Sequence, residues 1–175
     1  MIEHWDAWQV AEPLQQLEHI CDVSTLLLLS TMDAEKEFDF YLLHLMTAAH
    51  ALRVIWHIFP PERQAPMLRE FAISAIAMYI CQKRPSLKVS QIEAVETKGR
   101  DWQWVQQTAI DHPGRLDVHF FKAVRAPMAF KDTFGEKDGF YLKAAIKFLE
   151  TFSGWTGFGL GLDGFDPRGE GWYPK

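Results

Sequence analysis

The sequence predicts an all-α fold, a compact bundle of about six helices followed by an irregular tail rich in glycine and aromatic residues. Apolar residues recur at helical spacing along most of the chain, prolines and glycines separate those stretches, and no pattern of paired strands is evident. The 175 residues fit one domain with a sizeable core. We therefore expect a helical domain over residues 1–153 and a tail over residues 154–175 packed on it.

Proline and glycine mark the ends of the expected helices. Pro13 favours the first turn of the first helix, and Pro60 with Pro61 stops the second. Pro66 opens the third, which is apolar on most faces and should be central. Pro127 is expected to kink the fifth. The six expected helices cover residues 13–31, 35–59, 66–82, 92–110, 116–128 and 139–152.

The tail differs in composition from the helices before it. Seven glycines from Gly154 onward preclude a helix, whereas the interspersed Phe and Trp residues indicate a strap packed over the body. The spacing of Gly157, Gly159 and Gly161 follows a helix and not a strand, so it does not indicate a dinucleotide site.

Composition excludes several classes of partner. The net charge of −5 comes without a block of Lys or Arg, which argues against nucleic acid. The longest apolar runs fall short of the roughly 20 residues that span a bilayer. Cys21 and Cys81 form neither a disulfide framework nor a zinc motif, and the chain starts acidic without a secretory signal. A cytoplasmic protein is expected.

Three of the seven histidines fall on the predicted helix over residues 35–59. At 100° per residue, His44 and His50 lie about 120° apart around the helix, so one metal ion could not easily bind both. His57 precedes the Pro60-Pro61 stop, where a cation suits the helix dipole. We interpret it as a helix-end residue.

A second polar group lies on the predicted helix over residues 116–128. His119 and Lys122 are three residues apart and point the same way, with Asp117 before them and Arg125 a turn further on. By spacing alone, a solvated face with loose ion pairs is the simpler interpretation. The chemical alternative requires a buried Lys122 with a depressed pKa, because only a neutral amine can act as a base, nucleophile or adduct site.

Two stretches carry a resemblance to a known family. They are residues 38–53, FDFYLLHLMTAAHALR, and residues 117–126, DVHFFKAVRA. Over about residues 38–126 the chain resembles the questin oxidase-like family, helical oxygenases that act on anthraquinones and related aromatic polyketides. The resemblance implies an oxidoreductase that takes a flat phenolic substrate among its Phe, Trp and Met side chains.

Some members of that family are non-haem iron enzymes in which histidines and a carboxylated lysine hold the metal. By resemblance, His44, His119 and Lys122 as a carbamate match the ligand positions, with His119 and Lys122 closest to the chemistry. A lysine carbamate offers hard oxygen ligands beside imidazoles, which suits iron. His50 is a second choice of ligand, and His112 replaces His119 if the alignment is shifted across the turn.

Family members are longer, with an N-terminal half that supplies further histidine ligands. Three explanations stay open for this chain: His19 substitutes, another chain or a second copy completes the site, or the site has decayed. His4 and His19 are the only histidines before the second helix. The alternative to an oxygenase is therefore a non-catalytic helical subunit or small-molecule binding module. A homo-oligomer or a companion chain is the expected partner.

Overall fold

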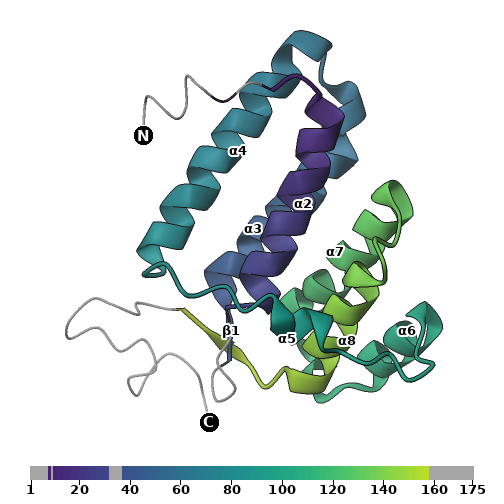
Figure 1. Ribbon diagram of the computed structural model, residues 1–175. Coiled ribbons are helices and arrows are strands. Elements are labelled where there is room, and N and C mark those ends of the chain that lie inside the picture. The colour runs from purple at the N-terminus through teal and green to yellow at the C-terminus, as the bar shows by residue number, and fades with distance from the viewer. Residues whose placement is uncertain (1–7, 9, 32–36, 158–175) are drawn as a thin grey trace.

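The computed structural model describes residues 8, 10–31 and 37–157. Within them the chain forms seven α-helices, two short 3-10 helices and one pair of two-residue strands, so the all-α prediction is confirmed. In Figure 1, α2, α3 and α4 form one group of helices, while α5, α6 and α7 lie around α8 in a second group. Contacts of α3 with α7 and of α2 with α8 join the two. The remainder of the predicted tail, residues 158–175, lies outside the described residues.

The expected helices are found with changes at their ends, except that the one expected over residues 92–110 is divided into two. The first two are α2 (Pro13–Leu29) and α3 (Phe40–Ile55), which a 3-10 turn, η1 (Trp56–Ile58), extends toward the prolines. The others are α4 (Pro61–Cys81), α5 (Ser90–Glu93), α6 (Trp102–Asp111), η2 (Pro113–Leu116), α7 (Val118–Phe134) and α8 (Phe140–Thr151).

The signal at Pro66 was misinterpreted. The third helix begins at Pro61, and Pro66 lies inside it, because a proline near the N-terminal end removes only one helical hydrogen bond. The fifth expected helix, α7, is longer than expected: it includes the buried Pro127 and continues as far as Phe134, six residues beyond the expected end, and stops at Gly135 with φ of 88°. The glycine, which adopts a positive φ without strain, ends this helix, and the proline does not.

The helix expected over residues 92–110 is two helices. Lys98 and Gly99 both have positive φ, and the turn that they form separates α5 from α6. Asp101 then starts α6 by accepting a hydrogen bond from the backbone N–H of Trp104 at 2.9 Å. Apolar residues continue at helical spacing across this turn, so their pattern did not indicate the break.

The prediction that the third helix is central was wrong. Within the described part of the chain, Leu68 is the one buried side chain of α4, while Ile73, Ile76 and Ile80 are exposed by 44%, 47% and 53%. Figure 1 shows α4 at the outer side of the α2, α3 and α4 group. An apolar helix can be buried, but its sequence does not say whether a neighbour covers it.

The core lies where α3, α7 and α8 meet. Its largest fully buried side chains include Phe38, Met46, Phe120, Tyr141 and Phe148. Apolar area removed from water on this scale is the main stabilising contribution to a domain of this size. The described residues contain no helix long and apolar enough to cross a membrane.

A polar cluster ties α2 to the loop before α8. The hydroxyl of Tyr141 and the ammonium of Lys137 each donate to Asp22 at 2.5 Å, and Lys137 also lies 2.7 Å from Glu18. Burial, and then the hydrogen bond to Asp22, raise the pKa of Tyr141 well above its ordinary value. The phenol therefore stays a neutral donor at physiological pH.

No strand pair was expected, yet the structure has one. The strand β1 (Phe38–Asp39) pairs in parallel with β2 (Trp155–Thr156), in the register Phe38 with Trp155 and Asp39 with Thr156. The pairing is only two residues long, too short for an alternating pattern to reveal in sequence. It brings the segment after α8 to the start of α3, beside the histidines described next.

Candidate functional site

His44 is held in one orientation by the first turns of α3. Asp39 caps this helix, its Oδ1 accepting from the backbone N–H groups of Tyr41 and Leu42 at 2.8 and 2.9 Å. One turn on, Nδ1 of His44 lies 2.7 Å from the carbonyl oxygen of Phe40. Because a carbonyl only accepts, Nδ1 carries the proton, and Nε2 keeps its lone pair for another partner.

His119 is oriented in a similar way at the start of α7. Asp117 caps this helix by accepting from the backbone N–H of His119 at 2.7 Å, and the same oxygen lies 3.3 Å from Nδ1 of the imidazole. The other oxygen of Asp117 accepts from the indole N–H of Trp155 at 2.5 Å. The carboxylate therefore favours a proton on Nδ1 of His119 and a lone pair on Nε2.

The two imidazoles lie next to each other. Their ring centroids are 5.4 Å apart, and the ring of Phe40 lies 4.5 Å from His44 and 4.7 Å from His119. With metal–nitrogen bonds of about 2.1 Å, two imidazoles on one ion have ring centres roughly 4.5 to 6 Å apart. The spacing of His44 and His119 thus fits two ligands of one metal ion, each backed by an oxygen acceptor.

His44 also borders an open cleft of about 660 Å³ between α3 and α7. Lys122 lies in its wall, one turn beyond His119 and half-buried, and it makes no hydrogen bond or ion pair to any described residue. The predicted residues therefore gather in one region, on two facing helices. The residues that line the cleft are His44, Thr47, Ala48, His50, Ala51, Val54, Ile55, Lys122 and Arg125.

His50 lines the same cleft but stands apart from the imidazole pair. Burial first, and then the nearby cations Arg53 and Arg125, lower its pKa to about 4, so it is neutral at physiological pH. Its Nδ1 is buried without a hydrogen-bond partner among the described residues. No ring contact of His50 with His44 or His119 is found within the described residues, in line with the 120° expected from helical spacing.

The other described histidines have different surroundings. His112 stacks on Phe120 with ring centroids 4.6 Å apart, and its Nδ1 accepts from the backbone N–H of Gly114 at 2.9 Å. His112 thus caps a turn and packs on the core, and no ring contact of His112 with His44 is found among the described residues. His57 lies exposed in η1, at the helix end as interpreted from the sequence. His4 lies outside the described residues.

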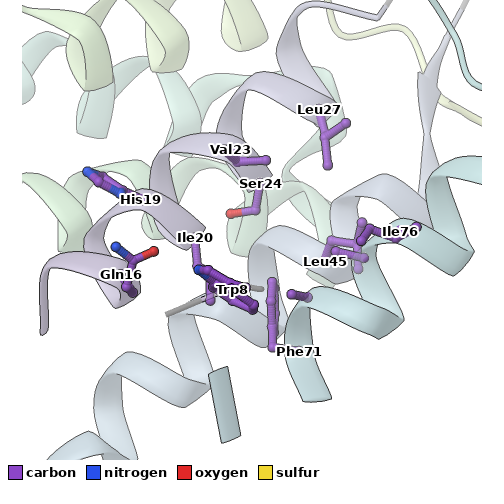
Figure 2. Close-up of a pocket in the computed structure, with 12 residues that line it drawn as sticks. Trp8, Gln16, His19, Ile20, Val23, Ser24, Leu27, Leu45, Phe71 and Ile76 are labelled. Atoms are coloured by element: carbon purple, nitrogen blue, oxygen red, sulfur yellow. The ribbon is translucent and has the colours of Figure 1, made fainter. Parts of the chain in front are cut away.

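His19 lines a second pocket, which the sequence did not indicate. This pocket of about 240 Å³ lies between α2 and α4, with Trp8, Ile20, Leu45 and Phe71 in its walls (Figure 2). Its lining is almost wholly apolar, and the hydroxyl of Ser24 already donates to the carbonyl of Cys21. The structure thus does not bring His19 into the cleft that His44 borders.

Among the described residues no three His, Cys, Asp or Glu side chains converge on a single point. His44 and His119 would therefore need a further ligand, and a carboxylated Lys122 is a candidate of a kind outside those four residue types. Sequence reasoning missed two contributors, Phe40 and Trp155. Phe40 stands four residues before His44, a spacing that could have indicated it, whereas Trp155 is brought in only by the strand pair.

A comparison with protein families decides the classification. The model of the family described as questin oxidase-like matches residues 1–127. The chain belongs to the questin oxidase-like family. The match is wider than the expected segment, 38–126, and takes in α2 as well as α3 and the first part of α7. No curated protein and no solved structure matches this chain.

Proposed function

We propose that this member of an oxygenase-like family is a non-haem iron enzyme that acts on a polycyclic aromatic molecule of the anthraquinone type. His44 and His119 would hold the metal through Nε2, with Lys122, as a carbamate, supplying oxygen ligands. The observation that carries the proposal is the pair of imidazoles 5.4 Å apart, each with its Nδ1 directed at an oxygen acceptor.

The residues around the pair would have defined tasks. Asp117 holds the imidazole of His119 and favours the tautomer that leaves Nε2 open. Phe40 covers one side of both rings and keeps water away from it. Bound iron would supply the redox chemistry by which oxygenases use dioxygen. His50, the second choice of ligand, would line the substrate cleft.

The aromatic substrate would lie in the cleft between α3 and α7. That cleft has polar groups beside His44. The lining of the pocket between α2 and α4 is apolar except for Gln16, His19 and Ser24. A volume of about 660 Å³ is also within the range of sites for drug-sized molecules.

Iron analysis tests the proposal. The protein is purified, loaded with Fe(II) without oxygen and desalted, and its iron is counted by mass spectrometry. We expect close to one iron per chain, most of it lost in His44→Ala and in His119→Ala. His57→Ala, a substitution at an exposed histidine of η1, is the matched control and should keep its iron. A content well below one per chain, unchanged by His119→Ala, would refute the proposal.

A second candidate function is a binding module without catalysis. The observation that favours it is that two imidazoles, and no third His, Cys, Asp or Glu, converge in the described part of the chain. A companion chain or second copy that completes the site stays a prediction, tested by measuring iron and molar mass together. Iron that binds only in an oligomer would support completion by a partner, and no iron in any state would support the binding module.

A further inference from the structure

The polar groups of the α3–α7 cleft share one property. Before any carboxylation of Lys122, this residue and Arg125 bring positive charge to its lining from α7, and no Asp or Glu is among the described lining residues. Arg53 adds charge close behind His50. A cleft with this balance favours a negatively charged or acceptor-rich ligand over a cation.

His50 adds a neutral donor to this wall. Its Nδ1 is buried without a partner, and a buried N–H without an acceptor is costlier and rarer than a bare lone pair. The proton is therefore expected on Nε2, the other nitrogen of a ring that lines the cleft. In this tautomer His50 donates, whereas His44, six residues earlier, presents a lone pair.

The remaining surface is apolar. Ala48, Ala51, Val54 and Ile55 line the cleft along α3, and their short or branched side chains carry no polar atom. Val54 and Ile55 are 48% and 40% exposed. A ring system laid on this surface would remove apolar area from water while its edge reached the donors.

We propose that the α3–α7 cleft binds a flat apolar molecule through an oxyanion, carboxylate or phenolate, which Arg125 and His50 hold by hydrogen bonds. The proposal deepens the proposed function, since it rests on the same cleft as its substrate site, but it requires no metal. Arg125 suits the task because its forked guanidinium donates two parallel hydrogen bonds to a carboxylate.

Calorimetry on the metal-free full chain tests the proposal with three small probes. They are 2-naphthoate, its neutral isostere 2-naphthamide, and 4-nitrophenol at about pH 8, where the absorbance of the phenol reports its ionised form. We expect naphthoate to bind about fivefold or more tightly than naphthamide, and the difference to shrink as salt rises. Binding of nitrophenol as the phenolate would extend the site to phenols, and naphthoate alone would restrict it to carboxylates.

Variants connect the binding to the residues. Arg125→Gln should remove most of the preference for naphthoate over naphthamide, and His50→Phe should weaken naphthoate several-fold. Arg63→Gln, at an exposed arginine on α4, is the matched control and should bind like the wild type. Equal affinity for naphthoate and naphthamide, or a preference that survives Arg125→Gln, would overturn the proposal. Because no metal is present, this result is independent of the iron analysis.

Discussion

The indole of Trp155 donates a hydrogen bond to Asp117, the residue that caps α7 and lies 3.3 Å from the imidazole of His119. Trp155 follows α8 and reaches this position because β2 pairs with β1 at the start of α3. The segment after the last helix thus supports the orientation of a histidine 36 residues earlier in the chain. Three of the predictions below depend on this group of residues or on Lys122 beside it.

Trp155→Phe removes the indole donor and keeps an aromatic ring against Phe152, which lies 5.0 Å away. We expect little change in stability and a fall of about tenfold in metal affinity, because outer-shell partners of ligating histidines typically contribute that much. Titration with Co(II) as a spectroscopic substitute measures it. Trp104→Phe on α6 is the control, and an equal loss of affinity in both variants would contradict the prediction.

The substitution Asp117→Asn separates two roles of Asp117, the cap of α7 and the negative charge beside His119. Asparagine caps a helix about as well as aspartate, so the free energy of unfolding should change by about 0.5 kcal/mol or less. Metal affinity should still fall by about tenfold or more, because the neutral amide no longer holds the Nδ1 proton of His119 as the carboxylate does. Urea unfolding and metal titration are measured on the same sample. A loss of stability with unchanged affinity would assign Asp117 to the fold alone.

Carboxylation of Lys122 predicts dependence on carbon dioxide. The neutral amine adds to the carbon of CO2, an N–C bond forms, one C–O π bond opens, and a proton leaves to solvent. Iron content should therefore rise with added bicarbonate in the wild type and stay low in Lys122→Gln. Lys98→Gln, at an exposed loop lysine, should behave like the wild type. Bicarbonate without effect on the wild type would argue against a carbamate.

His50 predicts a loss of stability in mild acid. Its folded pKa is about 4 and its ordinary value is 6.5, so between these values the unfolded chain binds more protons and stability falls as pH falls. Burial first, and then the cations Arg53 and Arg125, act against protonation of His50 in the folded state. After a discount for its partial exposure the effect is about 1 kcal/mol.

The comparison with His50→Gln isolates that effect. Urea midpoints measured from neutral pH down to about pH 4 contain the titration of every other group in both proteins. The midpoint of the wild type should fall more steeply than that of the variant. Parallel pH profiles would show that His50 is solvated and free to protonate.

Helical periodicity predicted the fold class because each helix buries one face against a neighbour. Burial of one face requires apolar residues at helical spacing, which can be read from the sequence. It could not find the break at Lys98 and Gly99, where backbone dihedrals and not side-chain polarity interrupt the helix. Nor could it predict that α4 lies at the outside of the fold, since an exposed isoleucine such as Ile76 fits the same helical spacing as a buried one.

Helical spacing also predicted part of the candidate site. His119 and Lys122 share a helix face by spacing alone, and their neighbourhood with His44 followed from the family resemblance. Trp155 could not be found, because its place depends on a strand pair of two residues between distant segments. Tertiary contacts of this kind leave no local periodicity.

A metal ion shared by His44 and His119 is central to the proposed function. An anomalous-difference map, recorded at the iron edge from crystals of the Fe(II)-loaded protein, tests it most directly. We predict one strong peak between the Nε2 atoms of these two histidines, with the side chain of Lys122 directed at it. A featureless map at that position, or a peak bound by other residues, would contradict the claim.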